Sequence, residues 1–147
     1  MGVVVLAGSV DRYEGEILVE NLTINAVSRY VGLEGVRLPS GWGEMRYGAG
    51  RGRYRGQWVR GVREGCGEMI SPGRILTRYL GQWLQDKQTG WGVIHYSNGA
   101  TYTGNWVNNL YHGRGRLSWS NGDSYTGNFS YGSMHGQGTY LYEDGSR

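Results

Sequence analysis

The pattern Tyr-x-Gly-x-aromatic occurs four times in the last two thirds of the chain, at steps of 25, 23 and 23 residues. Each copy is followed by a Gly-x-Gly whose first glycine lies 11 residues after the tyrosine. The copies consist of Tyr54, Gly56 and Trp58; Tyr79, Gly81 and Trp83; Tyr102, Gly104 and Trp106; and Tyr125, Gly127 and Phe129. Periods of this length are typical of solenoids and other repeat arrays. The sequence therefore predicts stacked repeats rather than one compact domain.

Weaker copies precede these four. One begins at Tyr30 and keeps the interval of 11 residues to the next Gly-x-Gly, but Glu34 stands where the aromatic residue is expected. An earlier tyrosine, Tyr13, is followed by glycine two positions later and starts a degenerate copy. We therefore expect a degenerate N-terminal hairpin over residues 1–29 and an array of about five units over residues 30–147.

Residue types alternate within each copy, as expected for β-strands with two different faces. In residues 51–58, glycine and aromatic residues occupy every second position, and arginine or glutamine fills the positions between them. Asn-Gly and Asp-Gly pairs between the later copies favour tight hairpin turns. We expect one β-hairpin per copy and an all-β fold, an elongated single-layer antiparallel meander of stacked β-hairpins.

The expected register within a hairpin brings glycines of the two strands together. Pairing Trp58 with Gly65 would set Gly56 against Gly67, so that large rings lie beside bare backbone that they can cover. This arrangement would explain why 28 of the 147 residues are glycine.

The composition argues against several classes of protein. A chain with 28 Gly, only 2 Pro and 13% aromatic residues is neither collagen-like nor typical of disorder. The single cysteine, Cys66, cannot form an internal disulfide, and no apolar run reaches membrane-spanning length. We expect a cytoplasmic protein, with the cytoskeleton or the membrane periphery as finer alternatives. No nucleophile motif, phosphate loop or metal-ligand cluster is recognisable, so we expect no enzyme activity, no metal and no cofactor.

These repeats resemble MORN (membrane occupation and recognition nexus) repeats. The resemblance rests on Tyr-x-Gly-x-Trp, the polar turn and the Gly-x-Gly before a strand, and it covers about residues 30–147. It is best over residues 79–147, where His112 and His135, each followed by glycine, also match the turn. The resemblance implies a rod of β-hairpins used as a scaffold or docking surface, often near membranes or the cytoskeleton, and sometimes joined to a lipid kinase or methyltransferase domain. It implies no chemistry of the repeats themselves.

We interpret the chain as a non-enzymatic scaffold for protein–protein interaction. The alternative is an accessory targeting array of a larger enzyme, such as a lipid kinase or methyltransferase, that binds anionic phospholipid. The repeat phase places a further tyrosine directly after Arg147, so the expected array is either cut there or ends in an open strand edge. Open edges pair with other chains, and self-association is therefore expected as well.

Arginine supplies 14 of the 15 basic residues and gathers in residues 37–78, which sum to a net charge of +6. The alternation predicts four arginines on the polar face, Arg51, Arg53, Arg55 and Arg78. They are candidates for contact with an anionic membrane surface. The other interpretation is pairing within the chain, since the expected register sets Arg55 opposite Glu68. Arg60 and Arg63 are expected in a turn.

Aromatic residues outside the repeat pattern are candidates for protein docking. Trp42 and Trp91 fill the middle of their Gly-x-Gly motifs, which places them on the polar face, and Tyr111 and Tyr131 are expected in turns. Packing of the two tryptophans on arginine stems is the other interpretation. Nucleic acid is the least favoured partner, because the arginines and the repeated rings are expected on opposite faces.

Overall fold

In the computed structural model, residues 2–5, 12–20, 31–32, 35–48, 50–73 and 76–147 are described. Twelve strands of this part of the chain form one sheet. They are β1 (Gly2–Val5), β2 (Arg12–Glu20), β3 (Val31–Gly32), β4 (Gly35–Tyr47), β5 (Gly52–Val59), β6 (Val62–Ser71), β7 (Thr77–Leu84), β8 (Lys87–Tyr96), β9 (Thr101–Val107), β10 (Leu110–Ser118), β11 (Ser124–Ser130) and β12 (Ser133–Leu141).

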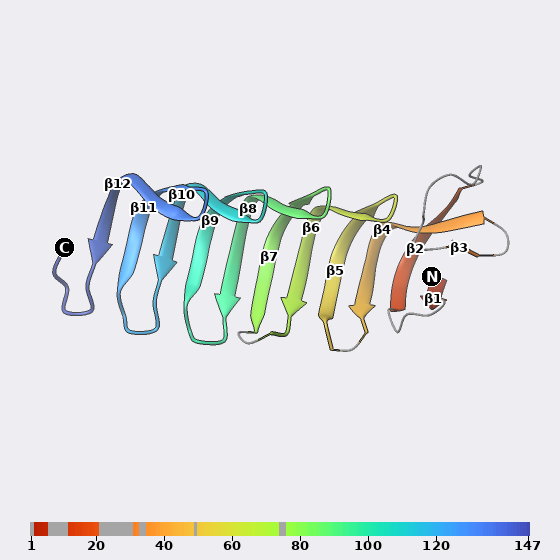
Figure 1. Cartoon of the computed structure of the whole chain (residues 1–147), viewed down its shortest axis with the longest axis horizontal. Coiled ribbons are helices and arrows are strands. Elements are labelled where there is room, and N and C mark those ends of the chain that lie inside the picture. Colours follow the sequence, from red (N-terminus) through yellow and green to blue (C-terminus); the bar gives the residue numbers. More distant parts are fainter. Residues whose placement is uncertain (1, 6–11, 21–30, 33–34, 49, 74–75) are drawn as a thin grey trace.

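Each strand pairs antiparallel with its neighbours, and from β4 onward the order in the sheet is the order in the chain. β3 pairs only with β4 and lies off this path. Figure 1 shows the result as a long ribbon, with the strands side by side along its axis. The expected all-β meander of stacked hairpins is confirmed.

One face of the ribbon, the inner face, carries a continuous ladder of aromatic rings. Tyr54, for example, meets Trp58 of its own unit at 5.0 Å and Trp83 of the next unit at 5.2 Å between ring centroids, edge to face in both cases. The indole Nε1 of Trp83 also donates a hydrogen bond to the carbonyl oxygen of Gly67 in the preceding unit, at 3.2 Å. Ring pairs of this kind add about 0.5–1.5 kcal/mol each beyond their burial. The ladder therefore ties every unit to its neighbours.

Paired glycines make room for the rings. Gly56 lies opposite Gly67, and the ring of Tyr54 covers both. A Cβ atom added at Gly67 would overlap the Tyr54 ring, and one at Gly56 would lie 2.5 Å from the Cα of Gly67. The same pairing recurs in the hairpins that follow, up to β11 and β12. The glycines of the repeat are thus a packing requirement.

A bulge interrupts each hairpin between the glycine pair and the aromatic residue. Trp58 lies two positions from Gly56, whereas Arg63, the residue that faces Trp58, lies four positions from Gly67. The expected pairing of Gly56 with Gly67 is confirmed, but the expected pairing of Trp58 with Gly65 is wrong.

The physical reason for the bulge is a left-handed backbone held by a side chain. Gly65 has a φ of 87°, and the Oε1 atom of Gln57 accepts a hydrogen bond from the Cys66 backbone N–H at 2.8 Å. Gly65 instead pairs with Trp83 of the next unit. The left-handed glycine interrupts the pairing with β5, so the register shifts there, whereas the pairing of β6 with β7 continues through Gly65 without a shift.

The bulges let the ends of the hairpins fold over the ring ladder. Figure 1 shows the upper parts of β6, β8, β10 and β12 crossing the top of the ribbon before each strand turns downward. Tyr111 of β10 stacks on Tyr102 with 3.8 Å between centroids, and the Arg63 guanidinium of β6 lies 4.4 Å from the centroid of the Trp83 ring. This cover explains how a single-layer sheet buries its rings completely, with Tyr54 and Tyr102 at 0% exposure.

The first unit of the ribbon differs from the expected one. Gly43 of β4 pairs with Gly15 of β2, and Tyr13 of β2 joins the ladder with its centroid 5.6 Å from that of Trp58. The repeat spacing predicts that the copy beginning at Tyr30 supplies the partner strand of this Gly-x-Gly, and this prediction is wrong. Spacing could not show the true partner, because a long segment intervenes between β2 and β4. Tyr30 itself lies outside the described residues, and the division of the chain before it stays a prediction.

Replacing one ladder ring should weaken two interfaces. We expect Trp83→Ala to lower the free energy of unfolding by about 3–5 kcal/mol, because it leaves a cavity and removes ring contacts to Tyr54 and Tyr79. The matched control is the neighbouring Leu84→Ala, which removes an exposed side chain and should cost no more than about 0.5 kcal/mol. Urea unfolding followed by circular dichroism measures both. Equal losses in the two variants would contradict the ladder.

Alkaline pH should destabilise the ribbon. Burial raises the pKa of Tyr102 to about 12 and also raises the pKa values of Tyr54 and Tyr79. The unfolded chain releases these protons near pH 10 and the folded chain holds them, so stability is full below about pH 10 and is lost as the pH rises towards the folded pKa values. Urea unfolding at about pH 8 and about pH 11 should show the fall, and Tyr102→Phe should reduce it. An unchanged free energy of unfolding would contradict this account.

Candidate functional site

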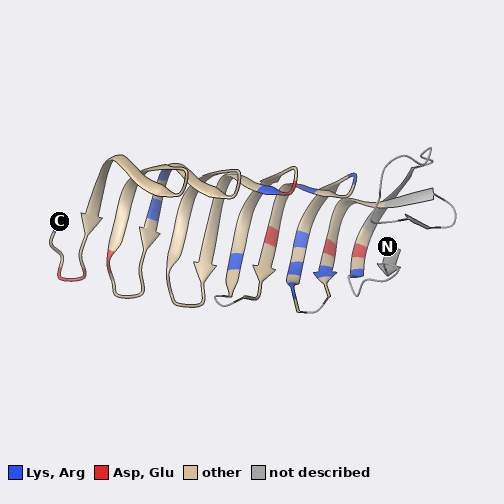
Figure 2. Ribbon diagram, in the orientation of Figure 1, with Lys and Arg blue, Asp and Glu red and all other residues tan. Residues whose placement is uncertain are grey.

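The face opposite the ring ladder, the outer face, carries three rows of side chains that run across the strands. The arginine row contains Arg12, Arg46, Arg53 and Arg78; the middle row contains Glu14, Glu44, Arg55, Glu68 and Leu80; and the tryptophan row contains Trp42, Cys66 and Trp91. Figure 2 shows that most charged residues on the described strands lie on β2 to β7. The outer face of this half of the ribbon is therefore the candidate site.

Ion pairs join the arginine row to the middle row. The Nε atom of Arg46 lies 2.6 Å from Oε1 of Glu44, and this hydrogen bond raises the pKa of Arg46. Arg53 lies within 3.9 Å of the same carboxylate, and Arg78 pairs with Glu68. The pairing interpretation of the arginines is therefore supported for Arg53 and Arg78.

Arg55 occupies the centre of the middle row. It faces Glu44 on one side and Glu68 on the other, so its expected position opposite Glu68 is confirmed. Both carboxylates bond to other arginines, and among the residues that the structure describes Arg55 has no ion pair within 4.0 Å. Its guanidinium is therefore a cation of the middle row that forms no ion pair with a described carboxylate.

Arg51 does not share the strand face of the other three candidates. It lies in the turn before β5, where its Nε donates a hydrogen bond to the carbonyl oxygen of Gly48 at 2.9 Å. Gly52 follows with a φ of 100°, which breaks the alternation on which the expectation rested. The prediction of four arginines on one strand face is right for Arg53, Arg55 and Arg78 and wrong for Arg51.

Trp42 and Trp91 lie on the outer face as expected, on β4 and β8. Their exposures are 58% and 54%, whereas the ladder tryptophans are buried. Within the described part of the chain neither ring contacts another aromatic ring or a guanidinium. Packing on the aliphatic stems of arginines stays the alternative prediction for these rings.

The two tyrosine candidates differ from each other. Tyr131 lies in the turn between β11 and β12 and is 67% exposed, with its ring centroid 5.0 Å from that of His112. Tyr111 lies in β10 rather than in a turn, where it stacks on Tyr102 and shares a hydrogen bond with the hydroxyl of Tyr96. Because its ring belongs to the cover of the ladder, the docking prediction for Tyr111 is not supported.

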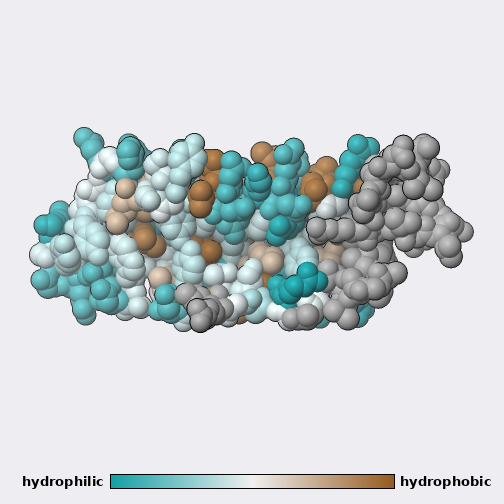
Figure 3. Space-filling model, in the orientation of Figure 1, coloured by the Kyte–Doolittle hydropathy of each residue, from teal (hydrophilic) through white to brown (hydrophobic). Residues whose placement is uncertain are grey.

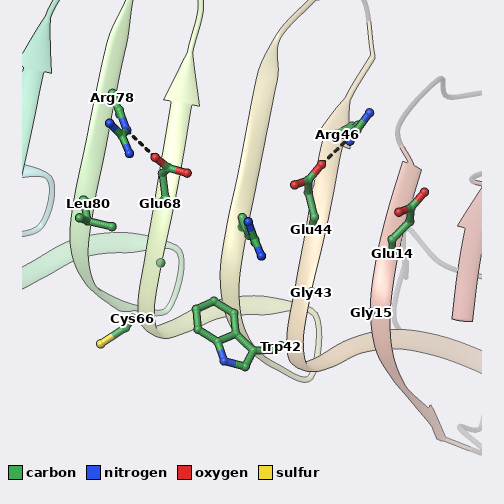
Figure 4. A pocket seen from close by; sticks show the side chains of 12 residues that line it. Glu14, Gly15, Trp42, Gly43, Glu44, Arg46, Cys66, Glu68, Arg78 and Leu80 are labelled. Atoms are coloured by element: carbon green, nitrogen blue, oxygen red, sulfur yellow. Dashed lines mark hydrogen bonds and ion pairs between the residues drawn. The ribbon is translucent and has the colours of Figure 1, made fainter. Parts of the chain in front are cut away.

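A groove of about 740 Å³ follows the middle row from β2 to β7. Figure 4 shows its two unlike walls, with Arg46 and Arg78 on one side and Trp42 and Cys66 on the other. The floor is the middle row, where Leu80 forms the end on β7. A ligand in this groove would meet charged groups along one edge and apolar groups along the other.

The sequence pattern did not predict the exposed aliphatic side chains beside the hairpin turns. Val59, Leu84 and Leu110 all lie next to turns and are about half exposed. Figure 3 shows apolar side chains along the upper edge of the ribbon, separated by hydrophilic ones. The signal in the sequence is the position directly after the ladder tryptophan, which holds Val59 and Leu84.

Arg63 also has a role that the turn pattern concealed. It lies in β6, and its Nε atom is 2.8 Å from Oδ1 of Asp86 in the turn of the next unit. Its guanidinium packs over the ring of Trp83. Arg63 is therefore a link between units rather than a cation offered to a partner.

No group of three or more His, Cys, Asp or Glu side chains in the described ranges could hold a metal ion. In the same ranges no helix is long and apolar enough to cross a membrane.

Stacked hairpins that share one ring ladder define a β-hairpin repeat protein. Comparison with known protein families matches the MORN repeat at residues 54–73, 79–101, 102–124 and 125–147. These stretches make up more than half of the chain, and the chain belongs to the MORN-repeat family. The MORN repeat is a non-catalytic module of protein and membrane interaction. A comparison with curated proteins found no match.

The outer-face tryptophans should be dispensable for folding. We expect Trp42→Ser and Trp91→Ser together to change the free energy of unfolding by less than about 1 kcal/mol, because exposed side chains contribute little to stability. The control Trp106→Ser removes a buried ladder ring and should cost about 3–5 kcal/mol. Urea unfolding compares the two, and similar losses would show that the outer rings are structural.

Proposed function

We propose that this chain is a non-enzymatic docking scaffold that binds a protein partner on its outer face through Trp42 and Trp91. The observation that carries the proposal is the exposure of these two rings on the outer face of a sheet whose inner face is already packed. Buried tryptophans are frequent energetic anchors of protein interfaces. Four strand spacings separate the rings, about 19 Å, which is within the span of one ordinary interface.

The repeats themselves show that the fold does not require tryptophan at these positions. The corresponding position of the other units holds Cys66, Arg114 and Gln137. All three units still form the same hairpin with the same paired glycines. A large exposed ring that the fold does not need is available as an anchor for a partner.

A membrane surface is the weaker candidate for this face. Each basic residue near an anionic bilayer contributes about 1 kcal/mol, and three glutamates, Glu14, Glu44 and Glu68, alternate with the arginines here and would be repelled. A protein partner can place opposite charges selectively, which a uniformly anionic surface cannot do. The same face would also serve a targeting array of a larger enzyme, and a cytoplasmic, cytoskeletal or membrane-peripheral location is compatible with the proposal.

Self-association through a sheet edge is a separate part of the proposal. Only one side of β12 pairs with another strand of the described sheet, and its residues from Ser133 to Thr139 are exposed. Unpaired backbone groups of this kind can pair with a strand of another chain.

Comparative capture tests the docking proposal. Wild-type chain and the Trp42→Ser, Trp91→Ser double variant are immobilised, and the proteins retained from a cell lysate are compared by quantitative mass spectrometry. We expect the retained amount of at least one protein to fall tenfold or more with the double variant, because the variant loses an anchor worth about 2 kcal/mol. Arg114→Ser, at the same position of another unit, is the control and should retain that protein. Identical retention by all three chains would contradict the proposal.

A further inference from the structure

The outer-face groove is directional. It crosses five neighbouring strands of the sheet, β2, β4, β5, β6 and β7, so its long axis runs along the ribbon and perpendicular to the strands. A ligand that fills it must therefore be elongated along the same axis. Four strand spacings give the groove a length of about 19 Å.

The dimensions of the groove match an α-helix. Trp42 on one wall and Arg46 on the other lie four positions apart along β4, which is about 13 Å at the rise of a strand. An α-helix with its side chains is about 10–12 Å across, and about 13 helical residues span 19 Å. An extended chain would fill only part of this width.

The two walls select the sides of that helix. The tryptophan row offers Trp42 and the apolar edge of Cys66, and the opposite wall offers Arg46 and Arg78 of the arginine row. Arg55 in the floor adds a cation that no described carboxylate binds. A matching helix carries apolar side chains on one edge and carboxylates on the other.

The repeat length fixes the spacing of the apolar side chains. One unit advances the ribbon by two strand spacings, about 9.6 Å, and seven residues of an α-helix rise by about 10.5 Å. Positions seven residues apart therefore meet equivalent positions of successive units, which hold Trp42, Cys66 and Trp91 on the tryptophan row. The mismatch grows by only about 1 Å per unit, which side chains can absorb.

We propose that the outer-face groove binds an acidic amphipathic helix of a partner protein, whose apolar residues recur every seven positions and lie along the tryptophan row while its carboxylates meet the arginine row and Arg55. This inference rests on the proposed docking function and names the class of partner. A bilayer or a nucleic acid is less suited to the groove, because both present negative charge to the glutamates of the floor as well as to the arginines.

A designed peptide tests the proposal on the full chain. The probe has about 21 residues, leucine at every seventh position with a supporting apolar residue in each turn, and glutamate along one flank. There are two control peptides. One has the composition of the probe with the apolar positions shuffled, and the other has lysine in place of glutamate. Fluorescence anisotropy gives the affinities, and we expect the probe to bind at least tenfold more tightly than either control.

The single cysteine reports where the peptide binds. Cys66 is a free, exposed thiol on the groove wall, so its rate of alkylation by N-ethylmaleimide, measured by mass spectrometry, reports access to the groove. We expect the saturating probe to slow alkylation at least fivefold and the shuffled peptide to leave the rate unchanged. Equal protection by both peptides, or none by the probe, would overturn the proposal.

Variants of the two walls complete the test. Arg46→Glu with Arg78→Glu should weaken probe binding at least tenfold, Trp42→Ala should also weaken it, and Arg114→Glu, on the outer face but outside the groove, should not. Thermal unfolding monitors the fold of each variant, and Trp42→Ala keeps the ion pairs intact if the arginine variant unfolds early. Unchanged binding to both groove variants would overturn the proposal.

The outcomes separate this proposal from the docking function itself. If capture of a partner depends on Trp42 and Trp91 but the probe does not bind, the face docks proteins and the helix proposal is wrong. If phosphatidylserine vesicles protect Cys66 from alkylation and the probe does not, the groove faces a membrane and the helix proposal is again wrong.

Discussion

Edge-to-face packing of tyrosine on tryptophan holds this ribbon together, and the remaining features serve to make that packing possible. Tyr79, for example, lies 5.3 Å from Trp83 of its own unit and 5.1 Å from Trp106 of the next. The rings need glycine pairs beneath them and a folded-over hairpin end above them, because a single sheet has no second layer to exclude water. Since each ring serves two units, stability is shared between neighbours and no unit has a core of its own.

Local patterns were sufficient to predict the strands, the hairpins and the glycine pairs, since alternation and turn residues act over a few positions. Three features escaped them for physical reasons. The bulge depends on a hydrogen bond from the Cys66 backbone to the side chain of Gln57, which no alternation encodes. The partner of the first Gly-x-Gly is Gly15 in the strand that contains Tyr13, a long-range pairing that the sequence interval misassigned. The register shift also brings Tyr111 over the ladder instead of into a turn.

The candidate site was predictable to the level of a face and no further. Parity along a strand correctly placed Trp42, Trp91 and Arg55 on the outer face. It could not choose ion-pair partners, because long arginine side chains reach diagonally, and Glu68 bonds to Arg78 rather than to the Arg55 directly opposite. The groove also needed the structure, since its walls and floor come from residues on five strands that only the register brings together.

The spacing of large rings along the outer face has a consequence for alignment. A perfectly uniform array would look the same after a shift of one unit, and an elongated partner could slide along it with little change in energy. Here the rings skip a unit, with Cys66 between Trp42 and Trp91 and Arg114 beyond them. For a partner of the kind proposed above, a slip of one unit would move the side chain that meets Trp91 onto Cys66 or Arg114, so the irregular row would favour one alignment of that partner over the others.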